Sequence, residues 1–286
     1  MMIDTHCHLE KKDYDNLDEV IKKMDDNIII TSGVDKQTNI ECINLSEKYK
    51  NVFCTIGIHP EYANESDEQL NEMLKHIENN INNKRVVGIG EIGLDFHYDG
   101  YNKEKQKKLF ISQLELARKY NKTVVIHSRD SIAETYEILK QFKDLKKVIH
   151  CYSSSLEMAL EFIKINCVFG IGGVLTFKNS HKLVDVVKNI DLKYFLLETD
   201  SPYLTPEPYR GTKNEPYNIN HKKDVLIFTV IGIVIAFGYV LILNMLDTTI
   251  KSAQDIEKIS GVTVLASIPI YDLAETKSKG RRGGKR

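Results

Sequence analysis

The sequence predicts an α/β protein in which eight parallel strands close into a barrel, and three observations support this fold. Eight apolar runs of strand length recur along residues 1–203, amphipathic segments separate them, and metal-binding residue types follow several of the runs. Strands that alternate with helices favour parallel pairing, and eight repeats favour a closed (β/α)₈ barrel. An open doubly wound sheet is the alternative. An open sheet explains less well why metal-binding residue types follow the first, fourth, fifth, sixth and eighth runs.

The predicted strands are the apolar runs, taken in chain order. Their length and their content of β-branched and aromatic residues are typical of buried strands. They cover residues 2–9, 27–33, 52–59, 86–94, 123–128, 147–152, 168–173 and 195–200.

The predicted helices lie between these runs. Their apolar residues recur at i, i+3 and i+4, which gives each helix one face to bury. Asp130, Ser131 and the serines at 153–155 precede such segments and are residue types that cap helix N-termini. The clearest helical segments are residues 16–24, 39–50, 67–79, 103–120 and 130–142.

Composition excludes some classes of protein. The net charge of −1 over 286 residues gives no bulk reason to expect a nucleic acid or an anionic surface as partner. Five cysteines without CxxC spacing indicate no disulfide framework and favour a reducing compartment. Cys7 and Cys151 adjoin histidines, but neighbouring strand residues face opposite sides. We therefore expect both thiols to pack beneath the helices if the histidines face the barrel interior.

Residue types that bind metals stand at the carboxyl ends of five predicted strands. In a parallel barrel these ends share one rim, so distant residues are expected to meet there. Four imidazoles and two carboxylates exceed what one tetrahedral ion needs, so we predict two divalent ions. Mixed nitrogen and oxygen ligands suit zinc, manganese or iron. The candidate ligands are His6, His8, Glu91, His127, His150 and Asp200.

The predicted division of these ligands places Glu91 between the ions, because a carboxylate has two oxygens and can bridge. His6, His8, Glu91 and Asp200 would hold one ion, and Glu91, His127 and His150 the other. Glu91 and Asp200 are the candidate catalytic residues, with Asp200 accepting a proton from the attacking water. Asp4 is in phase with His6 and His8 on the first strand and is expected to orient a ligand.

Weaker candidates stand on the same rim. His59 either contacts the scissile group or completes a hydrogen bond. Arg129 could bind a phosphate, although an exposed arginine here needs no function. Arg210 could contact a phosphate too, although a structural role in its loop is favoured. Asp95 is expected to orient a metal ligand.

The alternating pattern stops after Ser201. The predicted barrel domain covers residues 1–216 and is followed by a linker at residues 217–224. Residues 225–246 carry no charge and, as a helix, would span about 33 Å, which predicts a transmembrane helix. A buried last helix of the barrel is the alternative, but this segment lacks the polar face that such helices keep. A basic tail occupies residues 247–286.

Several motifs in the barrel region resemble those of one enzyme family. IDTHCHL, GIHP, GEIGLDF, VIHSR, HCYS, TFKN, LLETDSPYL and YRGTKNEP occur in the order found in the TatD family of metal-dependent deoxyribonucleases, over about residues 2–216. The resemblance implies a TIM-like barrel, divalent metals that include magnesium, and a DNA phosphodiesterase with exonuclease behaviour. The family's last two helices are absent here, so we expect Ile3 and Leu196 on the outermost strands to lose their cover.

The C-terminal region resembles a different family. From about residue 216 the chain is similar to the end of a Wzz-type polysaccharide co-polymerase, a capsular chain-length determinant. This resemblance implies a membrane helix and a tail that contacts a tyrosine kinase. The chain thus resembles a fusion with its junction near residues 215–218.

Three functional hypotheses follow. The first is a DNA hydrolase tethered by a single membrane span, with its catalytic domain in the cytoplasm, as the basic residues at 210–223 and the lack of a signal peptide favour. The second is a non-catalytic membrane segment that acts in capsular polysaccharide biosynthesis. The third keeps the hydrolase and changes its substrate to a small amide or ester.

Overall fold

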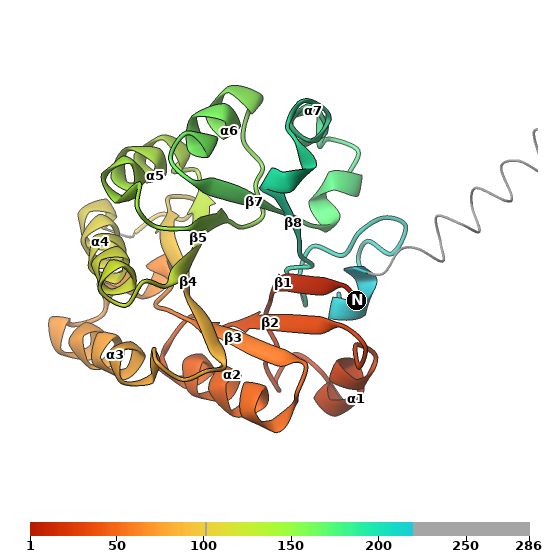
Figure 1. The fold of residues 1–286 in the computed structure, drawn as a ribbon, viewed down its shortest axis with the longest axis horizontal. Helices are drawn as coiled ribbons and strands as arrows, with labels where there is room; N and C mark the ends of the chain where they lie inside the picture. The colour runs from red at the N-terminus through yellow and green to blue at the C-terminus, as the bar shows by residue number, and fades with distance from the viewer. Residues whose placement is uncertain (101, 220–286) are drawn as a thin grey trace, which may run out of the picture. The chain divides into compact units, whose positions relative to one another are not determined.

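The computed structural model describes residues 1–100 and 102–219, and its centre is an eight-stranded parallel sheet (Figure 1). The strands follow one another in chain order from β1 to β8, without the reversal that marks a doubly wound sheet. The predicted TIM-like barrel is therefore confirmed. The strands are β1 Ile3–Cys7, β2 Ile28–Ser32, β3 Val52–Ile56, β4 Val86–Asp95, β5 Thr123–Arg129, β6 Lys147–Ile149, β7 Cys167–Ile171 and β8 Phe195–Leu197.

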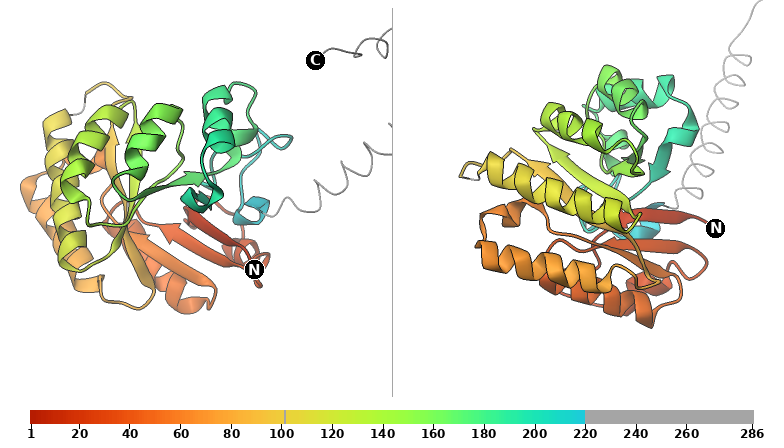
Figure 2. Two further views of the ribbon diagram at one scale, coloured as in Figure 1. Left: turned by 45° about the horizontal axis from the view of Figure 1, so that its top comes forward. Right: turned by 60° about the vertical axis from the view of Figure 1, so that its left-hand side comes forward.

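Helices connect the strands and cover the outside of the sheet (Figure 2). They are α1 Leu17–Lys22, α2 Lys36–Lys48, α3 Asp67–Asn80, α4 Lys103–Lys119, α5 Ile132–Leu139, α6 Leu156–Ile163 and α7 His181–Asn189. Short 3₁₀ turns are η1 Pro60–Asn64, η2 Lys140–Phe142, η3 Gly173–Thr176, η4 Leu192–Tyr194 and η5 Pro216–Ile219. Helix α2 begins earlier than its apolar pattern indicates because Asp35 caps it, accepting the Thr38 N–H at 2.7 Å.

Three buried side-chain amides hold the carboxyl ends of β3 and β4. Asn39, Gln106 and Gln113 each form two hydrogen bonds with the backbone of one residue. Gln113, for example, accepts the Ile58 N–H at 2.8 Å and donates to the Ile58 carbonyl at 3.0 Å. These bonds satisfy backbone groups that leave the strand ladder inside the protein. They fix the segments that carry the rim residues.

The barrel closes where β1 meets the segment after β8. The Asp200 N–H donates to the His6 carbonyl at 3.0 Å, and the Thr199 hydroxyl donates to the Asp4 carboxylate at 2.6 Å. Asp4 also accepts the Thr199 N–H at 3.0 Å. Asp4 was expected to orient a metal ligand through its side chain, but its carboxylate joins the first and last parts of the barrel instead.

No α-helix follows β8 within the described residues, as the break in the sequence pattern predicts. Ile3 is 39% exposed and Leu197 is 54% exposed, so apolar surface of both outer strands meets solvent, while Leu196 is half-buried. Across residues 1–100 and 102–219, the structure has no helix of the length and apolarity that a bilayer crossing requires. The predicted membrane span at 225–246 and the tail at 247–286, which carry the co-polymerase resemblance, lie outside the described residues.

We predict that Gln113→Leu destabilises the fold by about 2–4 kcal/mol, because it leaves a buried N–H and a buried C=O of Ile58 unpaired. Urea unfolding of the full chain measures this change. The matched control is Gln37→Leu on the exposed face of α2, with an expected change within about 0.5 kcal/mol. Equal effects of the two substitutions would contradict the role assigned to the buried amide.

Candidate metal centre and active site

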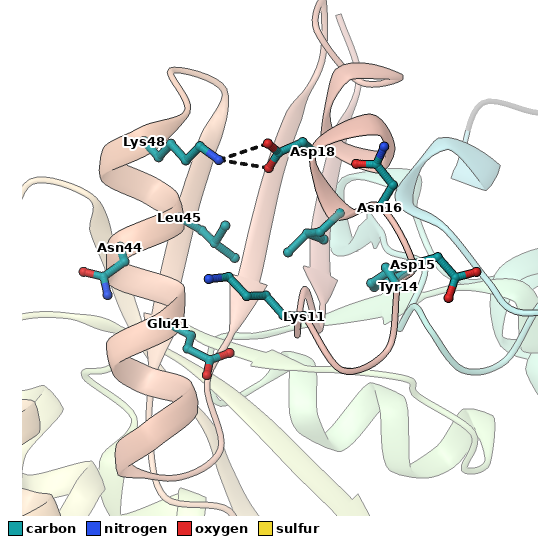
Figure 3. A pocket seen from close by; sticks show the side chains of 10 residues that line it. Lys11, Tyr14, Asp15, Asn16, Asp18, Glu41, Asn44, Leu45 and Lys48 are labelled. Atoms are coloured by element: carbon teal, nitrogen blue, oxygen red, sulfur yellow. Dashed lines mark hydrogen bonds and ion pairs between the residues drawn. The ribbon is translucent and has the colours of Figure 1, made fainter.

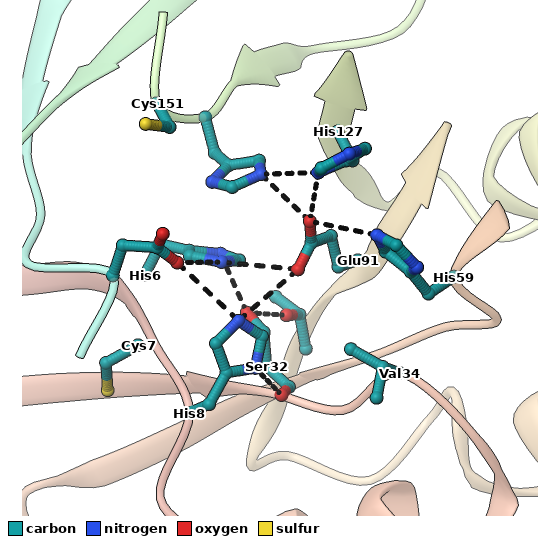
Figure 4. Close-up of polar contacts among 12 residues, drawn as sticks. His6, Cys7, His8, Ser32, Val34, His59, Glu91, His127 and Cys151 are labelled. Atoms are coloured by element: carbon teal, nitrogen blue, oxygen red, sulfur yellow. Dashed lines mark hydrogen bonds and ion pairs between the residues drawn. The ribbon is translucent and has the colours of Figure 1, made fainter. Parts of the chain in front are cut away.

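The six predicted ligands converge at the carboxyl-terminal rim of the barrel (Figure 4). They come from β1, β4, β5 and the segments that follow β1, β6 and β8. A pocket of about 500 Å³ opens over them and is lined by His8, Glu91, His127, His150 and Asp200, among others. Volumes of this size are typical of small-molecule sites.

Four of these residues form a cage with the spacing that a cation requires. The His6 Nε2 atom lies 3.5 Å from both Glu91 Oε2 and Asp200 Oδ1. The His8 Nε2 atom lies 3.4 and 3.6 Å from the same two oxygens. A tetrahedral ion with bonds of about 2.1 Å holds its ligand atoms about 3.4 Å apart. The buried His6 Nε2 also has no hydrogen-bond partner, so the donor set and its spacing fit a metal ion.

The other oxygen of Glu91 faces a second pair of histidines. The Glu91 Oε1 atom lies 2.7 Å from His127 Nδ1 and 2.8 Å from His150 Nε2, and the two nitrogens are 3.2 Å apart. These are hydrogen-bond distances, shorter than the edge of a tetrahedral cage. This second group must therefore open by several tenths of an ångström to admit a cation.

Hydrogen bonds from neighbouring residues orient the rings. Ser32 serves two histidines, since its carbonyl lies 3.0 Å from His8 Nδ1 and its hydroxyl lies 3.0 Å from His6 Nδ1. Asp95 Oδ2 lies 3.1 Å from His127 Nε2. Each contact leaves the opposite ring nitrogen facing the centre. The role of Asp95 is the one expected from the sequence, whereas Ser32 had no signal there beyond its position at the end of a predicted strand.

Charge is concentrated on the carboxylates and on three of the histidines. Burial opposes the charge of Glu91, but attraction to His150 and hydrogen bonds from the histidines hold its pKa well below the usual range. Burial likewise opposes the charge of His127, yet hydrogen bonds to Asp95 and Glu91 raise its pKa to about 9. Burial also opposes the charge of His8 and His150, but hydrogen bonds to Asp200 and Glu91 raise the pKa of His8, and attraction to Glu91 raises that of His150. Burial lowers the pKa of His6 to about 4.

Of the three predicted substrate-binding residues, two line the pocket and one does not. His59 and Arg129 line the pocket, and the Arg129 Nη1 atom donates to the exposed Tyr98 hydroxyl at 3.2 Å. Arg210 is not among the pocket-lining residues. Its guanidinium stacks on the Phe177 ring, 3.7 Å from the centroid, which holds it outside the pocket.

Two further features were missed from the sequence. His59, Asp95 and His127 together form a third group with metal-ligand spacing, although they were considered only one at a time. Glu198 is buried beneath the rim, and burial raises its pKa to about 8. The LLETD run offered no periodic signal to separate Glu198 from Asp200. The sulfur atoms of Cys7 and Cys151 point away from the cluster (Figure 4).

A second cavity lies outside the barrel, between α1 and α2 (Figure 3). It measures about 380 Å³ and contains an ion pair between Lys48 and Asp18 at 2.9 Å. None of the three groups with metal-ligand spacing found in the described part of the chain lies there. The candidate metal ligands of the described residues are therefore all at the rim.

Known proteins resemble this chain in sequence and in fold. The sequence matches the family model described as TatD related DNase over residues 3–230. It is 37% identical to the uncharacterized metal-dependent hydrolase YabD of Bacillus subtilis, over 77% of this chain and 88% of that protein. The crystal structure of YjjV, a TatD homologue from Escherichia coli, is similar with a TM-score of 0.69 and 28% identity, over 76% of this chain and 86% of the other. A TatD family hydrolase from Entamoeba histolytica is similar with a TM-score of 0.66 and 26% identity, over 77% and 88%.

We predict that divalent metal binding releases protons and strengthens as pH rises from about 6 to 9. In the metal-free protein the raised pKa values of His8 and His127 keep these two rings protonated near neutral pH, and the pKa of His150 is shifted in the same direction. A metal bond needs the unprotonated nitrogen, so each proton displaced contributes up to about tenfold in affinity per pH unit. Calorimetric titration with Zn²⁺ in buffers of different ionisation enthalpy counts the protons. A binding enthalpy that is independent of the buffer would contradict the prediction.

Proposed function

Because this chain belongs to the family of TatD-related metal-dependent hydrolases, we propose that it hydrolyses phosphodiester bonds in DNA with divalent metal ions as cofactors. The observation that carries the proposal is the position of Glu91 at the rim. Its Oε2 atom faces His6 and His8, while its Oε1 atom faces His127 and His150. This is the arrangement of a carboxylate that bridges two cations.

The charge of the pocket supports two ions. Six carboxylates line it, against the permanent cations Lys12 and Arg129. Once metal binding displaces the histidine protons, an anionic phosphodiester would be repelled by such a surface unless the bound cations neutralised it. Two divalent ions, zinc, manganese or magnesium, would offset most of this negative charge.

The residues of the rim have separable roles in this proposal. Bound divalent ions supply Lewis acidity that activates water and stabilises charge on the phosphate. Asp200 lies at the open side of the first cage and accepts the proton of the attacking water. The Arg129 guanidinium at the pocket wall pairs with a phosphate oxygen.

His59 acts as a hydrogen-bond donor to the substrate. Its Nδ1 atom accepts the Glu61 N–H at 3.3 Å, and burial lowers its pKa to about 3, so the ring is neutral. The proton of a neutral imidazole then lies on Nε2. That atom faces the pocket 3.7 Å from Glu91 Oε1, where it can donate to a phosphate oxygen.

DNA as substrate rests on the family description and on this charge argument, since the bacterial relative is named only a metal-dependent hydrolase. The membrane tether, the cytoplasmic position of the barrel and the kinase contact stay predictions that depend on residues outside the described part. The second hypothesis, a non-catalytic function in capsular polysaccharide biosynthesis, also stays a prediction.

We predict that Glu91→Gln lowers hydrolysis of a labelled single-stranded oligonucleotide by more than about 100-fold. Residues that only orient metal ligands already cost 10- to 100-fold when removed, and this change removes a ligand oxygen and the central charge. The assay uses the full chain with added Mg²⁺, Mn²⁺ or Zn²⁺, and a chelator is expected to abolish the activity.

The matched control is Glu61→Gln, which lines the same pocket outside the ligand groups and should keep near wild-type activity. Chelator-resistant cleavage, or a fully active Glu91→Gln variant, would contradict the metal-dependent mechanism. Metal-dependent hydrolysis of a small ester without cleavage of the oligonucleotide would keep the hydrolase and reject DNA as its substrate.

A further inference from the structure

Glu198 is a buried acid next to the metal centre with one of its oxygens unpaired. Its side chain is fully buried, and its Oε1 atom accepts the Cys151 N–H at 2.6 Å. The same oxygen lies 3.9 Å from His150 Nδ1. Neither His150 Nδ1 nor Glu198 Oε2 has a hydrogen-bond partner. Two unpaired polar atoms on neighbouring buried side chains need an explanation, because buried polar groups are nearly always paired.

Gly170 on β7 makes the space that Glu198 occupies. A Cβ atom added at residue 170 would lie 1.9 Å from Glu198 Oε2 and 2.5 Å from its carboxyl carbon. Gly170 is not among the residues with positive φ, so its backbone conformation does not require glycine. The absence of a side chain at residue 170 therefore serves to admit the carboxylate below His150.

The other three histidines of the centre each have a hydrogen-bond partner on the outward ring nitrogen, and His150 has none in the described part of the chain. His6 and His8 are oriented by Ser32, and His127 by Asp95, each through the ring nitrogen that faces away from the centre. Among the described residues, Glu198 is the only acid within 4.0 Å of the outward nitrogen of His150, Nδ1. Its inward nitrogen, Nε2, lies 2.8 Å from Glu91 Oε1.

Building on the proposed function, we propose that Glu198 is the positioning residue for His150. Its carboxylate accepts the Nδ1–H of the ring, so that the lone pair on Nε2 faces the second group of the metal centre. The contact must shorten from 3.9 Å to about 3 Å, as the second group opens to admit a cation. A carboxylate behind a ligating histidine fixes the tautomer and makes the ring a stronger ligand.

Glu198→Gln tests this role with little change in size. The amide oxygen can still accept the Cys151 N–H, so the fold is preserved, but the negative acceptor behind His150 is lost. We expect the Zn²⁺ affinity of the second group, which contains His150, to fall roughly 10- to 100-fold. Competition with a chromogenic chelator measures this affinity. The matched control is Glu68→Gln on the exposed first turn of α3, with unchanged affinity. Equal Zn²⁺ affinities of wild type and Glu198→Gln would overturn the proposal.

Two further measurements keep the proposal testable if that variant folds poorly. Gly170→Ala should displace the Glu198 carboxylate and weaken the same Zn²⁺ site while every ligand stays in place. In the Zn²⁺-loaded wild-type chain, ¹⁵N resonances of His150 should show a protonated Nδ1 and a metal-bound Nε2. A zinc-bound Nδ1 would overturn the role of Glu198. Wild-type protein in which Zn²⁺ leaves the His150 signals unchanged would instead contradict the proposed function itself.

Discussion

The carboxylate of Glu91 lies between four imidazole rings at the carboxyl-terminal rim of the barrel, 3% exposed to solvent. A buried charge without partners costs several kcal/mol, so this position is tolerable only when positive charge surrounds it. In the metal-free protein protonated histidines supply that charge. Metal ions would supply it more strongly, and they would release the protons that the histidines hold. The same carboxylate thus links the stability of the rim to its ability to bind metal.

Closure of the barrel determines whether Asp200 can join this group. Asp200 follows the last strand, whereas His6 lies in the first strand and His8 directly after it, and only the seam brings these residues together. The bonds between Asp4 and Thr199 and between the backbones of His6 and Asp200 hold that seam. No described α-helix follows β8 to pack across this seam, so these bonds carry much of the closure. The first metal cage therefore depends on contacts that lie outside the cage itself.

The two groups of candidate ligands differ in how closely their spacing matches that of a metal site. The first group already has the spacing of a tetrahedral site, while the second is closed by hydrogen bonds to Glu91. His150 belongs to the second group, and its outward nitrogen, Nδ1, has no hydrogen-bond partner among the described residues. In the proposed two-ion centre, this asymmetry gives the two ions different affinities.

The sequence by itself determined the order and number of strands, because burial and backbone hydrogen bonding impose a local periodicity that residues 1–203 display. It also determined the ligand types, since His6, His8, Glu91, His127, His150 and Asp200 each follow or end an apolar run. Tertiary structure alone decided the partners of these residues. Ser32 orients two rings, Arg210 stacks on Phe177 away from the pocket, and Asp4 bonds to Thr199 at the seam. Such contacts join residues that are distant along the chain, and they exist only after the barrel has brought its first and last strands together. No local pattern records them.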